Sequence, residues 1–337
     1  MQHSSFFKGK RVFITGADGF IGSHLAEVLA ESGAKVRAMV QYNSFGTWGN
    51  LEFLPKSTLS SIEIFPGDVR DPFSVDRGVT GCDVVFHLAA LIAIPYSYQA
   101  PQSYVETNVS GTVNVLQASL RHGVSKVVNT STSETYGTAM YRPIDEKHPL
   151  QGQSPYSASK IGADKMAESY FLSFNAPVAT IRPFNTFGPR QSARAVIPTI
   201  ISQIASGSRE VKLGSLTPLR DFTFVLDTVA GFLAVAESDK SVGEVINVGS
   251  GKSVSIGDLA KLIVELMGKT KEVTITGDDG ERVRPDKSEV MELLCNYAKA
   301  TELCQWQPRH SLKEGLLNTI SFVEKNLHRY KADIYNV

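Results

Sequence analysis

The sequence predicts an α/β protein: a doubly wound parallel sheet, with a smaller α/β substrate-binding region that comes mainly from the C-terminal part. Two observations carry this prediction. A short apolar strand at residues 11–15 runs into Gly16, Gly19 and Gly22 and then into an amphipathic helical stretch. Up to about residue 183, further apolar runs alternate with helical segments, and this alternation is typical of a parallel sheet with helices on both faces.

The glycine turn after the first strand suits a dinucleotide. Gly16 and Gly19 let the backbone turn tightly and approach a pyrophosphate, and Gly22 lets the helix pack against the strand. The N-terminus of that helix then faces the phosphates. The spacing is GxxGxxG, and a lone match could be a structural turn, but here the strand and the helix both lie where the motif requires them. We therefore expect a Rossmann-type cofactor site with contacts from Gly16, Gly19, Phe20, Ile21 and Gly22.

The end of the second strand, residues 35–40, does not decide between NAD and NADP. An acidic residue at this point would hydrogen-bond the adenosine ribose of NAD. Here Gln41, Tyr42, Asn43 and Ser44 follow, all uncharged, and no arginine stands immediately beyond the strand to pair with a 2′-phosphate. We expect Gln41 and Asn43 to contact the cofactor, and the residues alone leave both dinucleotides open.

The third strand, residues 62–65, leads to Asp68 and Val69. A carboxylate at this strand end could reach the adenine amino group, because ligands lie at the carboxyl ends of parallel strands. It could equally cap the helix that starts near Pro72. Both interpretations stay open, and Asp68 and Val69 are kept as cofactor candidates.

The fourth strand, residues 83–87, is followed by the small residues Leu88, Ala89 and Ala90, which would let a nicotinamide ribose lie close to the backbone. His87 itself is expected to be a packed core residue rather than a catalyst. The remaining alternation consists of a long helix at residues 101–122 and strands at residues 124–130 and 178–182.

A tyrosine and a lysine one helical turn apart form the candidate catalytic pair. Tyr156 and Lys160 face the same way on a helix. A phenol ordinarily has a pKa of about 10, but a nearby ammonium favours the phenolate and lowers that pKa. We expect Lys160 to act on Tyr156 in this way and to make it a general base. Taken alone, the same spacing also occurs on helices without any such role.

The loop before this helix supplies further candidates. Residues 130–137 are rich in hydroxyls and hold one carboxylate, Glu134. A plain turn rich in serine and threonine would look the same. However, this loop leaves the sheet at its ligand-binding edge. Thr132, Ser133 and Glu134 can therefore share a substrate with Tyr156.

After about residue 191 the pattern changes to shorter pieces. A helix is expected at residues 195–206, a strand from Arg220, and a helix up to Glu237 that Asp227 caps. The strand at residues 244–248 could return to the sheet. The sequence thus predicts a dinucleotide-binding domain at residues 1–190, to which 221–249 return, and a second region at 191–220 and 250–337, with helices at 256–267 and 312–326, all in one continuous body.

The composition excludes several kinds of partner. Lysine plus arginine and aspartate plus glutamate both total 34, so no net charge favours nucleic acid or an acidic membrane. No segment is apolar enough to span a bilayer, and residues 1–10 lack the core of a signal peptide. The three cysteines have no metal-ligand spacing, and their odd number in a long chain indicates reduced thiols. We expect a cytoplasmic protein without a metal site.

Taken as a set, these motifs resemble the extended short-chain dehydrogenase/reductases that act on nucleotide sugars. The set consists of the GxxGxxG turn, the Leu88-Ala89-Ala90 strand end, Thr132, and Tyr156 with Lys160, and it covers nearly the whole chain. Within that family, residues 89–98 and 185–198 are similar to the LegB-type 4,6-dehydratases of legionaminic acid biosynthesis, which act on nucleotide-linked N-acetylglucosamine.

The resemblance implies a redox-neutral 4,6-dehydration. Tyr156 would remove the proton of the sugar O4 as hydride leaves C4 for the nicotinamide, with Thr132 on the same oxygen and Lys160 on the cofactor ribose. The 4-ketone acidifies the C5 proton, which Glu134 would abstract before water leaves from C6 and hydride returns there. Better-known hexose 4,6-dehydratases carry Thr-Asp-Glu in this loop. Ser133 is a poor general acid, so the proton for the leaving hydroxyl would come from water, Glu134 or Tyr156, or the second step is different.

Three alternatives stay open. The Thr-Ser-Glu triplet also resembles that of the UDP-glucuronate decarboxylases, and 4-epimerases share the scaffold without needing a carboxylate in this loop. The third alternative is a sensor or scaffold that binds NAD(P) without turnover. The intact set of Thr132, Tyr156 and Lys160 argues against the sensor.

The resemblance also implies ligands and partners, and it makes residues 191–220 and 250–337 the expected nucleotide-sugar-binding region. NAD is the expected cofactor, with NADP not excluded, and the substrate is expected to be GDP- or UDP-linked. A homodimer is expected, because the helices at residues 101–122 and 156–174 pair across a two-fold axis as a four-helix bundle in this family. Further expected cofactor contacts are Asn108 and Pro183, and the expected substrate contacts are Asn185, Arg190, Val196, Arg220, Asn247, Arg282 and Arg284, the arginines facing the diphosphate.

Overall fold

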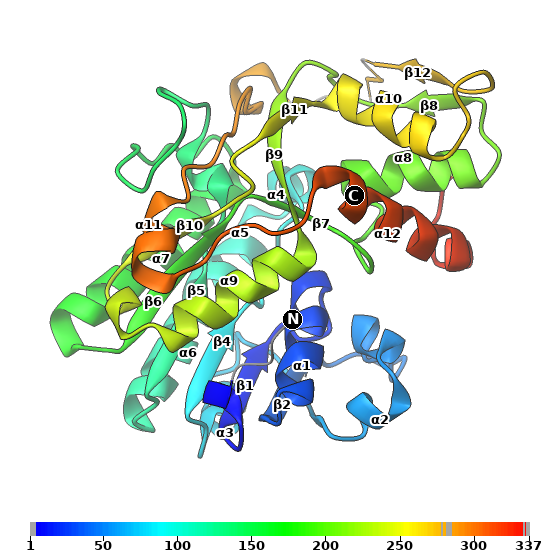
Figure 1. The fold of residues 1–337 in the computed structure, drawn as a ribbon. Coiled ribbons are helices and arrows are strands. Elements are labelled where there is room, and N and C mark those ends of the chain that lie inside the picture. The colour runs from blue at the N-terminus through cyan, green and yellow to red at the C-terminus, as the bar shows by residue number, and fades with distance from the viewer. Residues whose placement is uncertain (1–4, 278, 281–284, 333, 335–337) are drawn as a thin grey trace.

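The protein has a central sheet of seven strands. Helices cover this sheet, and shorter strands and helices gather beyond one end of it (Figure 1). The computed structural model describes residues 5–277, 279–280, 285–332 and 334. All neighbouring strands of the large sheet are parallel, in the order β10-β6-β5-β4-β1-β2-β3. This confirms the predicted doubly wound α/β fold. The strands are β1 (Arg11–Thr15), β2 (Lys35–Gln41), β3 (Glu63–Gly67), β4 (Val84–His87), β5 (Lys126–Thr130), β6 (Val178–Pro183) and β10 (Val245–Val248).

The apolar strands separate two hydrophobic cores, because successive side chains of a strand point to opposite faces of the sheet. Val12 and Ile14 of β1 belong to the larger core, whereas Phe13 belongs to the smaller one. Helices α1 (Phe20–Glu31) and α9 (Val225–Glu237) cover the first face, and α3 (Pro72–Val79), α6 (Gly111–Arg121) and α7 (Pro155–Phe174) cover the second.

The second region shares its core with the sheet. Ile197 and Ile320 belong to the same cluster of buried residues as Val12. The strand at residues 244–248 returns to the large sheet as expected, since β10 pairs with β6. Residues 221–224 do not return to that sheet, since β9 pairs with β7 and β11 instead. Two small sheets, β11-β9-β7 and β12-β8, complete the region. Its elements are β7 (Asn185–Phe187), α8 (Val196–Ala205), β8 (Glu210–Lys212), β9 (Leu219–Phe224), β11 (Ser253–Ser255), α10 (Ile256–Leu266), β12 (Thr274–Thr276), α11 (Ala298–Cys304) and α12 (Leu312–Lys325), and the shorter helices α2 (Lys56–Leu59), α4 (Ile94–Gln99) and α5 (Pro101–Tyr104) lie earlier in the chain.

Two expected elements differ in detail. The helix predicted over residues 101–122 is α5 followed by a π-helical segment, Val105–Ser110, and then α6. The prediction that Asp227 caps α9 was wrong, because the N-cap is Phe224. Asp227 instead accepts hydrogen bonds from Arg309 N–H and His310 N–H, at 3.0 and 2.9 Å. It therefore ties the chain before α12 to α9.

No helix in the described part of the chain is long and apolar enough to cross a membrane. The same residues contain no cluster of three or more histidine, cysteine, aspartate or glutamate side chains that could hold a metal ion. Cys82, Cys295 and Cys304 are all buried free thiols.

Candidate active site

Helix α7 carries both members of the candidate catalytic pair in its first turns. Ser154 caps the helix by accepting a hydrogen bond from Ser157 N–H, and the Ser157 side chain accepts from Ser154 N–H in return. Pro155 occupies the first position, where its missing N–H costs nothing. This start places Tyr156 and Lys160 inside the protein, with 7% and 3% of their surfaces exposed.

Burial makes the Tyr156 phenol a weaker acid than an exposed tyrosine. Desolvation raises its pKa above the ordinary value, the hydrogen bond with Thr132 opposes this, and the charge of Glu134 raises the pKa further. The expectation that Lys160 lowers this pKa is therefore not met in this structure. Lys160 Nζ donates to Thr130 O at 2.6 Å, and burial lowers the pKa of the ammonium itself.

The hydroxyl-rich loop brings Thr132 and Glu134 to the phenol. Residues Ser133–Tyr136 form a short helical turn that begins with Thr132, whose Oγ1 accepts from Glu134 N–H at 3.3 Å. Ser133 is buried, and Glu134 is half-buried close enough to Tyr156 to affect its pKa. The Thr132 hydroxyl thus bonds to the Tyr156 phenol, and the Glu134 carboxylate belongs to the helical turn that Thr132 begins.

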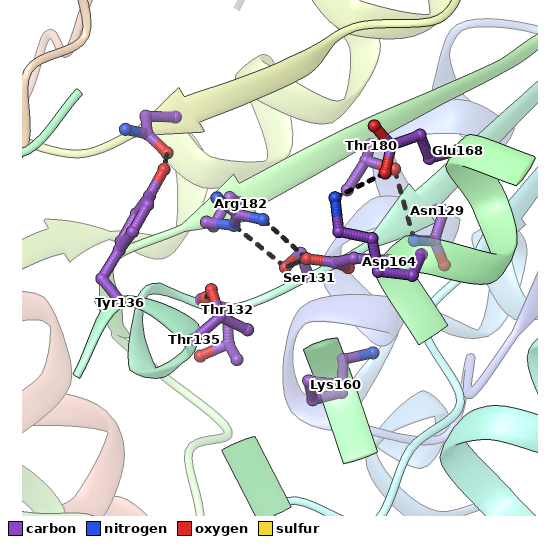
Figure 2. Close-up of polar contacts among 12 residues, drawn as sticks. Asn129, Ser131, Thr132, Thr135, Tyr136, Lys160, Asp164, Glu168, Thr180 and Arg182 are labelled. Carbon is purple, nitrogen blue, oxygen red and sulfur yellow. Dashed lines mark hydrogen bonds and ion pairs between the residues drawn. The ribbon is translucent and has the colours of Figure 1, made fainter. Parts of the chain in front are cut away.

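A buried polar network holds the catalytic loop against α7 and β6 (Figure 2). Arg182 Nη2 donates to Asp164 Oδ2 at 2.6 Å, and Ser131 Oγ donates to the same oxygen at 2.5 Å. Arg182 Nε donates to Ser131 Oγ at 3.1 Å, and the guanidinium lies 4.6 Å from the centre of the Tyr136 ring. Asp164 lies one turn after Lys160 on α7. The network therefore sets where the loop stands relative to Tyr156 and Lys160.

The glycine turn has the shape that a dinucleotide pyrophosphate needs. Gly16 has a φ of +68°, and a Cβ there would stand 2.8 Å from Ala89 N, so only glycine fits. Helix α1 begins at Phe20, and its N-cap, Gly19, provides no capping side chain. The first N–H groups of α1, including those of Phe20 and Ile21, therefore remain for an anion. These residues fit the pyrophosphate of NAD.

Thr15 positions the strand end where a nicotinamide ribose is expected. Its Oγ1 accepts from Leu88 N–H and Ala89 N–H, both at 3.1 Å. His87 bonds to the same hydroxyl at 2.8 Å and to Thr112 Oγ1 at 3.0 Å, and burial lowers the pKa of its imidazole to about 3. Its expected role as a core residue is confirmed.

Asn108 lies in the π-helical segment and joins this strand end to α7. Its side chain is fully buried, accepts from Leu91 N–H at 2.9 Å and donates to Ser159 Oγ at 2.9 Å. Those bonds hold the backbone beyond Ala90 in place. Direct contact of Asn108 with a cofactor stays a prediction.

The candidate contacts for the adenosine part of the cofactor follow two strands: Gln41 and Asn43 at the end of β2, and Asp68 and Val69 after β3. Gln41 ends β2 with its side chain exposed, and the Asn43 side chain is used within its own loop, where it donates to Thr47 O at 3.0 Å. Asp68 does not cap α3, since the cap is Asp71. It instead pairs with Arg70 at 2.6 Å, next to the buried Val69.

Three substrate candidates lie in or just after the paired strands β7 and β9. Pro183 ends β6, and Asn185 is the first residue of β7. The Asn185 Nδ2 atom is buried without a partner in the described structure. Arg190 pairs with Glu27 of α1 at 2.7 Å, and Arg220 pairs with Glu289 at 2.9 Å. Both guanidiniums are thus already bound to carboxylates.

For the other substrate candidates the structure shows no side-chain group that is free for a substrate among the described residues. Asn247 is fully buried, accepts from the Tyr136 hydroxyl at 2.8 Å and donates to Ile144 O at 3.2 Å, so a substrate contact through its side chain would require these bonds to break. Val196 is the half-buried first residue of α8. Arg282 and Arg284 lie outside the described residues.

The sequence analysis did not single out Asp18, Ser131, Tyr136, Asp164 or Arg182. For Asp164 a signal exists, because it stands one turn beyond Lys160 on the face that Tyr156 occupies. For the others the partners come from distant segments, as with Arg182 and Ser131, and no local pattern marks them.

Comparison with known proteins places this geometry in a family. The profile of the family described as GDP-mannose 4,6 dehydratase matches residues 13–319. The chain belongs to this family of nucleotide-sugar enzymes, within the extended short-chain dehydrogenase/reductases. This confirms the family-level part of the resemblance, whereas the LegB-type specificity stays a prediction.

The relatives of this chain are named for different reactions on nucleotide sugars. The chain is 33% identical over 322 residues to a UDP-N-acetyl-alpha-D-glucosaminuronate decarboxylase of Bacillus cytotoxicus, covering 93% of this chain and 97% of that one. It is 30% identical to a dTDP-glucose 4,6-dehydratase of Streptomyces antibioticus, covering 94% of this chain and 92% of that one. Proteins named as 4-epimerases also match over most of the chain.

A solved structure supplies the cofactor of the family. The dTDP-glucose 4,6-dehydratase of Streptomyces venezuelae, solved with NAD bound, superimposes with a TM-score of 0.83 at 25% identity, covering 95% of this chain and 99% of that one. Together with the glycine turn at Gly16, Gly19 and Gly22, this confirms the expectation of an NAD site at the level of the family.

Proposed function

We propose that the protein is an NAD-dependent nucleotide-sugar 4,6-dehydratase acting on GDP- or UDP-linked N-acetylglucosamine, in the biosynthesis of a legionaminic acid-type surface sugar. The observation that carries the proposal is the placement of Glu134. Its carboxylate lies close enough to the Tyr156 phenol to raise the pKa of that group, and Thr132 bonds to both the phenol and Glu134 N–H. In this proposal the phenol and the carboxylate serve two different proton transfers on one substrate.

The first step is oxidation at C4. Bound NAD supplies the hydride acceptor, later the hydride donor, and the positive charge of the oxidised nicotinamide ring. Tyr156 removes the proton of O4 while Thr132 holds that oxygen, and Lys160 holds the cofactor ribose. Because burial and Glu134 both favour the neutral phenol, proton removal depends on a nearby positive charge that favours the phenolate.

The second step belongs to Glu134. The C4 ketone acidifies the proton at C5, and the carboxylate takes that proton as the hydroxyl leaves C6. Ser133 is 2% exposed and is a poor acid, so water, Glu134 or Tyr156 supplies the proton to the departing hydroxyl. With NAD bound, hydride would return to C6 while a proton returns to C5 from Glu134 or water, and these two transfers would complete the 4-keto-6-deoxy sugar.

We further propose that residues 191–220 and 250–337 bind the nucleotide sugar, while residues 1–190 and 221–249 hold the cofactor. Asn185 belongs to residues 1–190, but its buried and unpartnered Nδ2 just beyond β6 favours a ligand there as well, because such a donor is costly unless a ligand accepts from it. To bind the diphosphate, Arg190 would have to leave Glu27 or contact both groups at once, and the same holds for Arg220 and Glu289.

A second candidate function is decarboxylation of a nucleotide-linked uronic acid. The Thr132-Ser133-Glu134 triplet, which resembles that of the UDP-glucuronate decarboxylases, favours it, and so does the 33% identical relative named as a decarboxylase. Both reactions share the C4 oxidation, so only the second step separates them.

Mass spectrometry of the product separates these functions. The purified protein is incubated with UDP- and GDP-N-acetylglucosamine and, separately, with the corresponding uronic acids. The proposal expects one N-acetylglucosamine substrate to lose the mass of one water. Loss of carbon dioxide from a uronic acid, with no dehydration, would establish the decarboxylase instead. An unchanged mass with conversion at C4 would indicate an epimerase, and no conversion of any substrate would favour the non-catalytic binder.

A further inference from the structure

The end of β2 lacks the acidic residue that usually recognises the adenosine ribose of NAD, yet the structure places a carboxylate there. Asp18 belongs to the glycine turn, between Gly16 and Gly19, and its Oδ2 accepts a hydrogen bond from Gln41 N–H at 3.1 Å. Gln41 is the last residue of β2. The carboxylate thus reaches from the turn after β1 to the end of the neighbouring strand.

Backbone contacts on both sides fix Asp18 in this position. Ala17 N–H donates to Met39 O at 3.1 Å, which holds the turn against β2, and Asn50 N–H donates to Asp18 O at 2.9 Å. Gly49 has a φ of +57°, and a Cβ there would stand 2.7 Å from Asp18 O. The loop after β2 therefore folds closely over the Asp18 backbone and holds it at the end of β2, where the hydrogen bond from Gln41 N–H orients the carboxylate.

The charge of Asp18 is left for a ligand. No lysine, arginine or histidine forms an ion pair with it among the residues that the structure describes. Burial raises the pKa of this carboxyl, and the hydrogen bond from Gln41 N–H opposes that effect. A carboxylate accepts more hydrogen bonds than the one that Gln41 donates, so acceptor capacity remains at the strand end.

We propose that Asp18 selects NAD over NADP: its carboxylate accepts a hydrogen bond from the adenosine ribose and repels the 2′-phosphate of NADP. In most proteins of this fold the selecting acid comes from the strand β2 itself. Here it comes from the glycine turn, and the uncharged run after Val40 no longer argues against NAD. The inference concerns the cofactor alone, so it holds for a dehydratase, a decarboxylase or an epimerase.

The test is a competition between the two dinucleotides. The purified protein is dialysed to equilibrium against equal concentrations of NAD and NADP and then denatured, and the released dinucleotides are quantified. Wild-type protein should release NAD in large excess. In Asp18→Asn, which keeps the shape and an acceptor for Gln41 N–H, the ratio of NADP to NAD should rise about tenfold or more, since a like-charge contact costs at least the free energy of one tenfold step. Asp18→Ser should shift the ratio in the same direction.

Glu52→Gln is the matched control. Glu52 Oε1 accepts from Thr47 Oγ1 at 2.8 Å and Trp48 N–H at 2.9 Å, so it steadies the same loop without a charge in the glycine turn. Its ratio should stay at the wild-type value. An unchanged ratio in both Asp18 variants, an equal shift in Glu52→Gln, or a preference of the wild-type protein for NADP would each overturn the proposal.

Discussion

Tyr156, Lys160 and His87 show how burial shapes the chemistry of this site at the scale of single residues. Desolvation raises the pKa of the phenol and lowers the pKa values of the ammonium and the imidazole, so all three shift toward their neutral forms. The spacing of Tyr156 and Lys160 predicted their shared helix turn. It could not predict that burial would raise the pKa of the phenol, because burial depends on residues such as Tyr104 that come from distant parts of the chain.

Removing the phenol hydroxyl tests its proposed role. Tyr156→Phe keeps the ring that packs against Tyr104 and removes only the proton acceptor, so turnover should fall by about 10²–10⁴-fold while bound NAD is retained. Tyr170→Phe is the control, since Tyr170 lies on the same helix with its hydroxyl bonded to Gln117 at 3.0 Å. Initial rates and the dinucleotide content of both variants decide the matter; near-normal rates in Tyr156→Phe would remove the first step of the mechanism.

At the scale of elements, long-range contacts explain what local patterns missed. The glycine turn, the strands and the boundaries of α7 follow from local sequence, and their prediction was confirmed within a few residues. The wrong assignment of Asp227 as a cap arose because its partners, Arg309 and His310, lie far along the chain. Asp18 and Arg182 were missed for the same reason.

The buried pair between α7 and β6 should contribute strongly to stability. Asp164→Asn leaves Arg182 buried without its counter-charge, which typically costs about 3–5 kcal/mol. Glu168→Gln, one turn further along α7, breaks an exposed pair with Lys165 and should cost less than about 1 kcal/mol. Urea unfolding of the two variants checks this contrast, and equal losses would show that the network in Figure 2 adds no special stability.

At the scale of the whole molecule, two histidines make stability depend on pH. Burial is the largest cause that lowers the pKa of His24 to about 4 and of His87 to about 3. As pH falls below the unfolded value of about 6.5, the unfolded chain binds protons that the folded chain does not. The free energy of unfolding should therefore decrease from pH 6.5 toward pH 4, by up to about 1.4 kcal/mol per pH unit for each group.

Replacing one histidine isolates its share of this slope. His24 Nε2 lies 3.0 Å from Pro189 O, and glutamine can donate to the same carbonyl. Urea unfolding of His24→Gln at pH 7 and pH 5 should show a smaller loss than the wild-type protein shows. An unchanged difference would mean that His24 does not carry the predicted share.

The predicted homodimer also belongs to this scale. Val105 of the π-helical segment and Leu172 of α7 are 47% and 71% exposed, and pairing of these helices with those of a second copy would cover both side chains. Light scattering at micromolar concentration should give twice the chain mass, and Leu172→Glu should reduce it toward the monomer. A monomer mass for the wild-type protein would contradict the four-helix bundle.

The central claim is that Glu134 takes the C5 proton, and one spectrum tests it most directly. Glu134→Gln leaves Tyr156, Thr132 and Lys160 able to oxidise C4 but removes the second base. After addition of nucleotide-linked N-acetylglucosamine, the variant should accumulate reduced nicotinamide, seen as absorbance at about 340 nm. The reaction should then stop, because hydride cannot be added to C6 while the C6 hydroxyl has not been eliminated. Normal turnover by Glu134→Gln, without that absorbance, would contradict the dehydratase account.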